Sequence, residues 1–478
     1  MIDKYRLNVP RFHVLSEGDC ELIHLSTLEV LRRTGVDVKE AKALEICKKG
    51  GCIVDGQRVR IPSHLAEQAL RNMPITVCLC DRNGNPAMHL EAGNVYFGTG
   101  SDTPFIVDHL TQERRKTVLR DIENTARLVD NLDEISFLMC MGIASDVNPA
   151  ISDLYHFEAM VNNTEKPIVY TAWNCANLKT IIRMAEAVAG GEEQLRNFPF
   201  LALYTEPISP LVLAEESTQK LMFMAEKSLP IIFTPAVMTG GSAPVTLAGG
   251  LIQANAEILA GYVLADLINE GTPFIYGGGI TQMDMATSQA LYASPELMLG
   301  QAGLTDMAKY YQLPMFTIAG CTDSNIYDQQ ASLEGAMWIL WSSINGGNLV
   351  HDVGYIDNGL TACYEQLVVS NEVIGMVRRI MGGIEINEET MALDLIDRVG
   401  PGGEYLTSSH TFKHFKKNWF PDLISRVPYD NWAAKGKKDL AARANDQIKH
   451  ILETHTSKPL EESIKAELRK IILSKDDR

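Results

Sequence analysis

The sequence predicts an α/β protein whose centre is a TIM (β/α)8 barrel. Between residues 135 and 354 one pattern occurs seven times, an apolar run that ends in small or polar residues. A stretch with helical periodicity follows each run, and strands that alternate with helices indicate parallel βαβ units. The runs are apolar on both faces, so each strand must be covered on both sides, as barrel strands are.

These runs supply seven of the eight strands that a barrel needs. Five begin with Pro, which is tolerated at the first residue of a strand because that residue can lack a hydrogen-bond donor. We expect VYFGTGS (95–101) to be the eighth strand, and an open, doubly wound sheet of seven strands is the alternative. The runs are ISFLMCMG (135–142), PIVYTAWN (167–174), PFLALYTEP (199–207), PIIFTPAV (230–237), PFIYGGG (273–279), PMFTIAGC (314–321) and NLVHDVG (348–354).

Helical periodicity predicts a ring of helices around the strands and further helices on either side. Residues 1–94 are predicted to form a mainly helical N-terminal cap and residues 95–385 the barrel. Residues 386–478 are predicted to form a C-terminal helical extension whose last thirty residues are solvated. The barrel helices are predicted at 121–132, 149–163, 176–190, 214–228, 251–270, 295–312, 329–345 and 360–381.

The composition indicates a globular protein with an acidic surface. Hydrophobic residues make up 46% of the chain, and its net charge of −17 argues against nucleic acid or an anionic membrane as a partner. The first residues carry charges instead of an apolar signal core, and no apolar run approaches the ~20 residues of a membrane helix. Nine cysteines without a CxxC pair favour reduced thiols and a cytoplasmic location.

Residues at the ends of the runs are the candidates for chemistry, because barrel active sites lie at the carboxyl ends of the strands. Aromatic residues gathered there would bind a quaternary ammonium by cation–π contact, with Glu206 as a carboxylate partner. Packing of the barrel top, and a structural ion pair for Glu206, are the alternative explanations. The aromatic candidates are Tyr96, Phe97, Trp173, Tyr204, Tyr276 and Tyr355.

Several polar residues also end runs. His351 and Asp352 follow NLV, where a histidine is a candidate proton carrier, metal ligand or satisfied core residue. No lysine ends a run, so a Schiff-base mechanism has no nucleophile, and GxSxG, HExxH and Walker A motifs are absent. Gly277–Gly279 resembles a phosphate-binding turn, although glycines at a strand end are more often a steric requirement. His410 and His414 lie among lysines, which favours a solvated basic helix face.

Residues 319–366, with the segments GCTDSN and HDVGY, resemble the trimethylamine methyltransferase superfamily, in particular members without pyrrolysine that act on glycine betaine and related quaternary amines. HLSTLEVLRRTGV (24–36) and YFGTGSDTPFIVD (96–108) are similar too, so the resemblance covers essentially the whole chain. It implies a TIM barrel that transfers a methyl group from the amine to the Co(I) of a separate corrinoid protein.

The resemblance also implies roles for the candidate residues. His351, Asp352 and Glu206 would serve catalysis, and Gly320, Cys321, Asp323 and His351 would face the corrinoid. The cobalamin would be carried by the partner protein, with no cofactor or metal bound tightly by this chain. The chain itself is expected to form a homo-oligomer. A cluster of backbone N–H groups, or a neutral donor such as Asn174 or Gln282, would receive the betaine carboxylate. The substrate-binding set would be Tyr96, Phe97, Trp173, Asn174, Tyr204, Tyr276, Gln282 and Tyr355.

Two other functions remain open from the residues. One is a zinc-dependent methyltransferase in which Cys175, Cys321 and His351 bind the metal. The other is a cytoplasmic betaine-binding protein without catalytic activity. Glycine betaine is the expected donor, and proline betaine, carnitine and γ-butyrobetaine are the related candidates.

Overall fold

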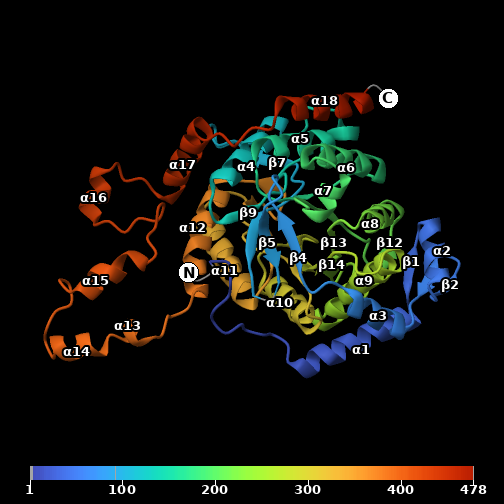
Figure 1. The fold of residues 1–478 in the computed structure, drawn as a ribbon, viewed down its shortest axis with the longest axis horizontal. Helices are drawn as coiled ribbons and strands as arrows, with labels where there is room; N and C mark the ends of the chain where they lie inside the picture. The colour runs from blue at the N-terminus through green and yellow to red at the C-terminus, as the bar shows by residue number, and fades with distance from the viewer. Residues whose placement is uncertain (1–3, 92, 477–478) are drawn as a thin grey trace.

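Eight parallel strands form a closed barrel at the centre of the computed structural model, which describes residues 4–91 and 93–476 (Figure 1). The strands at the two ends of the hydrogen-bonded series also meet, because Leu138 N donates to Pro167 O and Val169 N donates to Leu138 O, each at 3.0 Å. In order around the barrel they are β10 (Ile168–Tyr170), β11 (Leu201–Thr205), β13 (Ile231–Phe233), β15 (Phe274–Gly277), β18 (Met315–Ile318), β19 (Leu349–Val353), β6 (Tyr96–Thr99) and β9 (Ile135–Phe137). The predicted barrel, with its eighth strand within 95–101, is confirmed.

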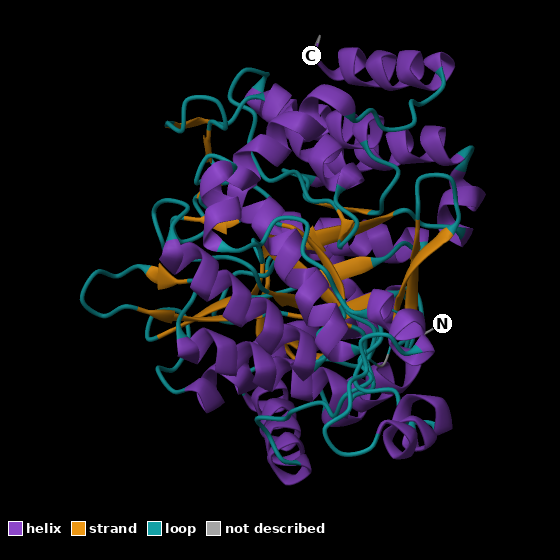
Figure 2. Cartoon of the chain, turned by 90° about the vertical axis from the view of Figure 1, so that its left-hand side faces the viewer, coloured by secondary structure: helices purple, strands orange, loops and turns teal. Residues whose placement is uncertain are grey.

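Eight long helices surround the strands, and Figure 2 shows the strands enclosed by them. The first seven helices each connect one barrel strand to the next, as the alternation of signals in the sequence predicts, and α12 follows the last strand, β19. They are α4 (Leu119–Asn131), α5 (Ser152–Asn163), α6 (Cys175–Ala189), α8 (Glu215–Lys227), α9 (Leu247–Ile268), α10 (Pro295–Tyr310), α11 (Gln329–Asn345) and α12 (Tyr364–Met381). Two short helices, η1 (Pro149–Ile151) and α7 (Glu192–Asn197), lie beside them.

Side chains of the barrel strands alternate between the interior of the barrel and the surrounding helices. Interior positions form one apolar cluster, which holds Val169, Ala202, Ile232, Ile275, Phe316 and Leu349. Their neighbours in sequence, such as Phe97, Tyr170, Phe233 and Tyr276, belong to a second cluster with the helices. This alternation decides which strand-end residues can reach a site inside the barrel.

The amino end of the barrel is closed by the hairpin of β4 (Val77–Cys80) and β5 (Pro86–Leu90). Val77, Leu79, Met88 and Leu90 of this hairpin pack into the interior cluster. A ligand can therefore enter the barrel only from the carboxyl ends of the strands.

The rest of the N-terminal region is an α-helical layer with a small sheet. Helices α1 (Glu17–Arg33), α2 (Ala41–Lys49) and α3 (Ser63–Asn72) pack against α9. Strands β2 (Ile53–Asp55) and β3 (Arg58–Arg60) form a hairpin, and β1 (Val36–Val38) joins it to β12 (Val212–Leu213).

Two small sheets stand at the mouth of the barrel, at the carboxyl ends of the strands. One contains β7 (Phe105–Val107), β8 (Arg114–Lys116), β20 (Tyr355–Ile356) and β21 (Thr361–Ala362). The other contains β14 (Ala236–Thr239), β16 (Gly279–Met283) and β17 (Ala290–Leu291). These insertions build the rim of the candidate site.

The C-terminal region leaves the barrel as an arm and then returns to it. The arm, residues 384–439, contains α13 (Glu388–Met391), α14 (Leu393–Val399), α15 (Ser409–His414), η2 (Phe415–Lys417) and α16 (Tyr429–Ala434), and it stands away from the barrel (Figure 1). Helix α17 (Leu440–Thr454) then packs against α12 and α4, and α18 (Glu462–Asp476) packs against α6 and α5.

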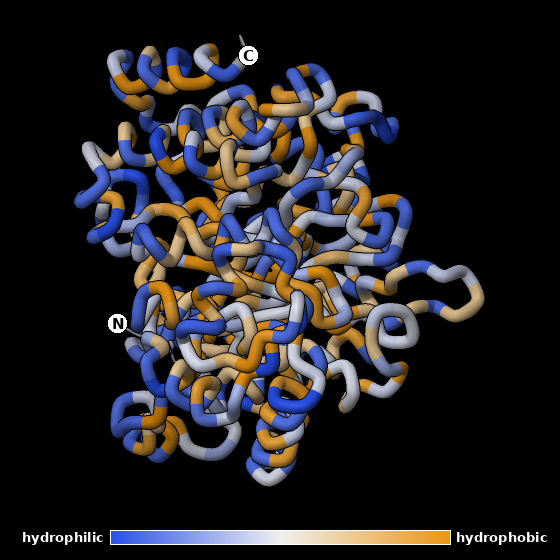
Figure 3. The backbone as a smooth tube through the Cα atoms, turned by 90° about the vertical axis from the view of Figure 1, so that its right-hand side faces the viewer, coloured by the Kyte–Doolittle hydropathy of each residue, from blue (hydrophilic) through white to orange (hydrophobic). Residues whose placement is uncertain are grey.

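The expectation that the last thirty residues are solvated is wrong. Ile451 of α17 and Leu468, Ile471 and Ile472 of α18 are buried. Figure 3 shows hydrophilic and hydrophobic residues alternating along the helix beside the C-terminus, as in an amphipathic helix that covers a core.

Helix α9 is the one described helix that is long and apolar enough to cross a membrane. Of its most apolar 18-residue window, 72% is buried inside the protein, and the helix packs between the N-terminal helices, α8 and α10. Helix α9 is therefore accounted for as a core helix.

Candidate active site

The barrel mouth contains two adjoining cavities that share Tyr204 and Glu206. The larger, of about 250 Å³, is lined by Asp102, Thr171, Trp173 and Lys220. The smaller is lined by residues of several strands and rim segments, among them Thr234, Thr281, Tyr292, His351 and Asp352. Because these residues come from different strands, only the closed barrel brings them together.

Tyr204 and His351 form the aromatic floor of this mouth. The imidazole of His351 stacks on Phe316 with 4.1 Å between ring centroids and an interplanar angle of 15°. Its centroid lies 5.9 Å from that of Tyr204. All three residues occupy interior positions of their strands, so their rings separate the apolar interior below from the polar mouth above.

Asp352 lies against the imidazole of His351 in a strained backbone conformation. Strand β19 has an irregular register between Val350 and Val353, and within it Asp352 has φ of +73°, in the left-handed region that favours glycine. This conformation brings Asp352 Oδ1 to 2.8 Å from His351 Nδ1. The contact lacks hydrogen-bond geometry, so Nδ1 has no hydrogen-bond partner among the described residues.

Two further carboxyl groups face the mouth from enclosed positions. Burial raises the pKa of Glu206, against the opposing effects of a hydrogen bond from the Tyr204 hydroxyl and of the nearby His351. Burial also raises the pKa of Asp102, whose Oδ1 accepts hydrogen bonds from Thr171 Oγ1 at 3.1 Å and Cys140 Sγ at 3.4 Å. Burial disfavours the ionised form of both carboxyl groups, and a cation placed beside them would favour it.

A lysine and an exposed tryptophan complete the larger cavity. Lys220 Nζ donates to Ala172 O at 2.8 Å, and burial lowers the pKa of Lys220 although Glu216, Asp153 and Glu206 oppose this. Trp173 is 48% exposed, and its indole Nε1 donates to Ser152 Oγ at 2.8 Å. The indole ring is thus fixed in place while its surface stays available to a ligand.

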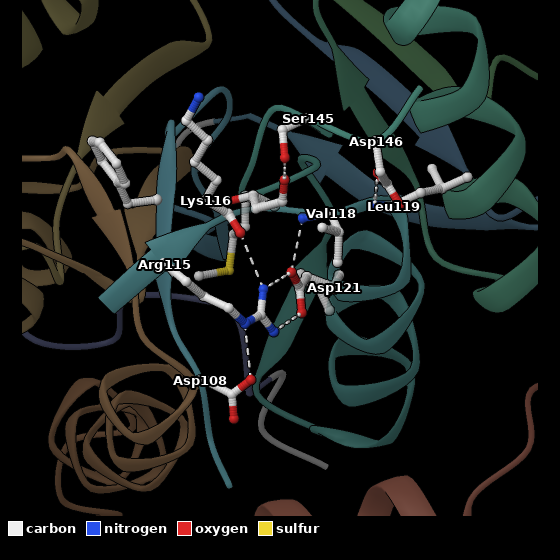
Figure 4. A network of polar contacts seen from close by, with 12 residues as sticks. Asp108, Arg115, Lys116, Val118, Leu119, Asp121, Ser145 and Asp146 are labelled. Carbon is white, nitrogen blue, oxygen red and sulfur yellow. Dashed lines mark hydrogen bonds and ion pairs between the residues drawn. The ribbon is translucent and has the colours of Figure 1, made fainter. Parts of the chain in front are cut away.

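An ion-pair network anchors the loop that carries Asp102. Arg115 on β8 donates from Nη1 and Nη2 to both carboxylate oxygens of Asp121 at 2.7 and 2.9 Å, and from Nε to Asp108 at 2.8 Å (Figure 4). Asp121 also accepts from Val118 N in the first turn of α4. The network therefore ties the β7–β8 hairpin to a barrel helix, with Asp102 at the base of that hairpin.

We expect Arg115→Met to destabilise the protein by about 1–3 kcal/mol, because the buried Asp121 carboxylate loses two charge-assisted hydrogen bonds. Urea unfolding followed by circular dichroism measures this change. The matched control is Arg120→Met. Arg120 pairs with Glu123 on the exposed face of α4, where an ion pair contributes little to stability. Equal effects of the two substitutions would contradict the anchoring role.

Three predicted aromatic residues do not reach the mouth. Tyr96 points into the barrel, but at its amino end, where it packs against Tyr5 and accepts a hydrogen bond from His89 N at 3.2 Å. Phe97 and Tyr276 occupy outward positions, and the Tyr276 hydroxyl donates to Asn255 on α9 at 2.9 Å. The sequence interpretation chose these aromatic residues because they lie near strand ends, without testing the alternation of the strand.

The predicted neutral donors for a carboxylate line neither cavity. Asn174 is the N-cap of α6, and its Oδ1 accepts from Asn177 N at 2.8 Å. Gln282 lies on β16, where its neighbour Thr281 lines the smaller cavity and Gln282 does not. Lys220, which sequence analysis missed because it lies on a helix, is the cationic residue that lines the larger cavity.

The residues predicted to face the corrinoid mainly support the rim. Asp323 accepts hydrogen bonds from Tyr292 N, Ala293 N and Asn358 Nδ2 at 2.7, 3.1 and 2.9 Å, and so holds Tyr292 over the cavity. Gly320 has φ of +78°, and Cys321 is buried with its Sγ 3.5 Å from Tyr292 O. Among them only His351 lines a cavity directly.

Tyr355 and the predicted glycines have steric roles. The Tyr355 hydroxyl donates to Ser101 O, and its ring covers Gly100, where an added Cβ would lie 2.2 Å from the Tyr355 ring. At Gly277 an added Cβ would lie 2.4 Å from Phe316 O, which supports the steric explanation of that glycine. His410 and His414 lie on the arm beside Glu389, far from the barrel mouth in sequence and fold.

The zinc set of Cys175, Cys321 and His351 is not assembled. Cys175 is the first residue of α6 and its Sγ contacts Gln219 O at 3.6 Å, whereas Cys321 Sγ contacts Tyr292 O. Within residues 4–91 and 93–476, no group of three or more His, Cys, Asp or Glu is arranged to hold a metal ion. The geometry therefore gives no support to the metal site that these three residues were expected to form.

Comparison with known families decides the class of this barrel. A family profile described as trimethylamine methyltransferase (MTTB) matches residues 2–478. The chain belongs to the trimethylamine methyltransferase family. It is therefore a methyltransferase, and its fold and catalytic class agree with the sequence prediction.

Relatives in this family cover nearly the whole chain. A trimethylamine methyltransferase MttB of Desulfitobacterium hafniense DCB-2 is 35% identical over 97% of this chain and 94% of its own length. A glycine betaine methyltransferase of D. hafniense Y51 is 31% identical over 97% of each chain. A solved structure, the monomethylamine methyltransferase MtmB of Methanosarcina barkeri, covers 94% of this chain at 12% identity with a TM-score of 0.48.

Proposed function

We propose that this enzyme transfers a methyl group from a quaternary amine to the Co(I) of a corrinoid carried by a separate protein, and releases the tertiary amine. Glycine betaine is the donor that we favour. The observation that carries this proposal is the mouth itself, in which buried carboxyl groups and aromatic rings surround one cavity. A glycine betaine methyltransferase among the relatives supports the choice of donor.

The enclosed carboxyl groups and rings suit a quaternary ammonium, which carries charge but no N–H to donate. Asp102, Glu206 and Asp352 supply negative charge from three strand ends. Tyr204 and Trp173 offer aromatic faces for cation–π contact, worth about 2 kcal/mol when the cation is desolvated. In the same cavity Lys220 would receive the carboxylate of a betaine, in place of Asn174 and Gln282.

The proposed reaction requires no covalent bond between the substrate and a residue of this chain. A quaternary ammonium already carries its positive charge and leaves as a neutral amine, and Co(I) of the partner supplies the nucleophile. The residues of the mouth have to strip water from the cation and hold one methyl group toward the entrance. His351 and Tyr204 would form the floor of the site and prevent the ammonium group from moving further into the barrel.

A ring of exposed apolar side chains around the mouth supports docking of the corrinoid protein there. Seven of the eight strand-to-helix connections each expose one large apolar residue, and only the connection from β9 to α5 exposes none among the described residues. Such a ring would match the size of a protein partner and exclude water once covered. The residues are Leu110, Trp173, Ile208, Val245, Met285, Ile326 and Leu360.

A cytoplasmic location completes the proposal, since Co(I) chemistry requires a reducing compartment. All nine cysteines are free thiols. That state agrees with the location predicted from cysteine usage.

A spectroscopic assay of cob(I)alamin methylation tests the proposal. We expect the Co(I) absorption to disappear when the enzyme is mixed with glycine betaine, and more slowly or not at all with trimethylamine. The panel includes proline betaine, carnitine and γ-butyrobetaine, so the preferred donor is identified in the same experiment. Reaction with trimethylamine alone would overturn the assignment to quaternary amines.

Binding of the quaternary ammonium should release protons. The raised pKa values of Glu206 and Asp102 favour their protonated forms in the free enzyme, whereas a bound cation favours their ionised forms. The cation therefore lowers both pKa values. The affinity for the cation rises with pH over the range between the pKa values of the bound enzyme and those of the free enzyme. Calorimetry in buffers of different ionisation enthalpy measures the released protons; proton uptake would contradict this prediction.

A further inference from the structure

Trp173 is hydrogen-bonded through both of its N–H groups, and both acceptors lie in the first turn of α5. Trp173 N donates to Asp153 Oδ2 at 2.9 Å, and the indole Nε1 donates to Ser152 Oγ at 2.8 Å. Two neighbouring residues of one helix therefore fix the backbone and the ring of a side chain that is 48% exposed. Ordering a large side chain costs conformational entropy, and these two hydrogen bonds offset that cost at one orientation of the ring.

The carboxylate of Asp153 holds N–H groups of the protein with both of its oxygens. While Oδ2 accepts from Trp173 N, Oδ1 accepts from Asn177 Nδ2 at 2.8 Å. Asn177 Nδ2 also donates to Ala150 O at 2.9 Å, so the start of α6 is tied to the turn before α5. Asp153 is buried and lines the larger cavity, but its hydrogen bonds go to the chain.

Helix α5 is a rigid base for these contacts. It packs against α4, α6 and α18, and nine of its twelve residues are buried (Figure 1). His156, one turn after Asp153, accepts from Ala144 N at 3.1 Å through Nε2, which ties the helix to the loop after β9. On the side of α18, Arg469 Nε lies 3.3 Å from Glu158 Oε1. A side chain that is hydrogen-bonded to this helix therefore keeps its place relative to the barrel.

The segment around Trp173 forms one wall of the larger cavity. Thr171, two residues before it, lines the same cavity and donates to Asp102 Oδ1 at 3.1 Å. Lys220 Nζ donates to Ala172 O at 2.8 Å, so the residue between them is held as well. Cation–π attraction depends on the separation of cation and ring, so a wall in a fixed position favours ammonium groups of one size.

We propose that Ser152 and Asp153 are specificity-determining positioning residues, which fix the indole of Trp173 so that the larger cavity favours a trimethylammonium group over bulkier ammonium groups. This inference rests on the proposed function, since it names the residues that set the donor specificity of the same site. Without Ser152 Oγ the indole N–H turns to solvent, and the ring can adopt other side-chain rotamers that widen the cavity.

Ser152→Ala removes the acceptor of the indole and leaves Asp153 in place. We expect the preference for glycine betaine over its triethylammonium analogue, measured by calorimetry as the ratio of the two dissociation constants, to fall by about 3- to 10-fold. Asp153→Asn should lower the same ratio, because it keeps the size of the side chain but leaves one oxygen for two N–H donors. Circular dichroism checks the fold of each variant.

Ser217→Ala is the matched control. Ser217 is buried in the first turn of α8, and its hydroxyl donates to Ala214 O at 3.2 Å. Ser152 makes the same contact with a carbonyl three residues earlier, Pro149 O, at 3.3 Å. Because Ser217 lines neither cavity, the control should leave the preference unchanged.

A double-mutant cycle with Trp173→Phe isolates the contact between Ser152 and the indole. Phe has no indole N–H, so Ser152→Ala should have no further effect on the preference in the Trp173→Phe background. Fluorine NMR follows the ring itself, since the chain has five tryptophans and Trp173→Phe assigns one signal of protein labelled with 5-fluorotryptophan. We expect Ser152→Ala to shift that signal and Ser217→Ala to leave it in place.

Three results would overturn the inference and leave the proposed function standing. They are an unchanged preference in Ser152→Ala, an equal loss in both backgrounds of the cycle, and a change confined to the KM for the corrinoid protein, which would make Trp173 a contact of that partner. A wild type that neither binds nor demethylates any quaternary amine would overturn the proposed function and this inference together.

Discussion

We expect the Glu206→Gln enzyme to lose about 30- to 1,000-fold in kcat/KM for its quaternary amine, because a desolvated cation loses a carboxylate partner worth about 2–4 kcal/mol. Gln preserves the size of the side chain and an oxygen that can accept from the Tyr204 hydroxyl. The change therefore removes charge while keeping shape. Steady-state cob(I)alamin methylation measures the loss.

A neutral substrate analogue separates charge recognition from packing. 3,3-Dimethylbutyrate has the shape of glycine betaine with carbon in place of nitrogen. Its affinity therefore measures every contribution to binding except that of the positive charge. The wild type should prefer glycine betaine strongly, and Glu206→Gln should reduce that preference while leaving the analogue unaffected. An equal loss for both ligands would show that Glu206 acts through packing.

Glu257→Gln is the matched control for this experiment. Glu257 is a buried glutamate on α9 whose pKa is also raised by burial, and its carboxylate accepts from Ser209 Oγ at 2.6 Å and Leu211 N at 2.9 Å. It lines neither cavity of the mouth. We expect this substitution to affect stability but to leave the discrimination between the two ligands unchanged.

The barrel could be predicted from the sequence because its strands are covered on both faces. The first four residues of a run such as PIIFTPAV are all apolar, so burial of the strand on both sides follows from composition alone. The end of each run then locates the mouth, and Glu206, Tyr204, His351 and Asp352 were found by that reasoning. Their presence around one pair of cavities depends on the closure of the barrel.

The remaining errors have two physical origins. Phe97 and Tyr276 were misplaced because a shift of one residue along a strand turns a side chain from the interior to the helices. Lys220 was missed because it lies on a helix, where no regular spacing relates it to the strand ends. Asp102 directly follows the run at 95–101 and was passed over although it stands at a strand end. The register of each strand against its neighbours is what an amino-acid sequence alone leaves undetermined.

His351 and Asp352 should behave as one unit in catalysis. We expect His351→Ala and Asp352→Gly each to lower kcat by about 100-fold. The first substitution removes the imidazole, and the second removes the carboxylate that lies beside it. The double variant should be no slower than the worse single variant, because residues that act together are not additive. Pre-steady-state and steady-state methylation assays measure these effects.

Stability measurements distinguish this unit from a structural pair. Asp352 has φ of +73°, where glycine avoids the strain of about 1–2 kcal/mol that a Cβ imposes, so Asp352→Gly should make the protein more stable while it becomes slower. Binding of the quaternary ammonium to His351→Ala should stay within a few-fold of wild type, and added imidazole should restore part of its activity. Two results would contradict a functional role for the strained Asp352 backbone beside His351. One is an Asp352→Gly protein that is less stable than the wild type, and the other is a double variant in which the two losses of activity multiply.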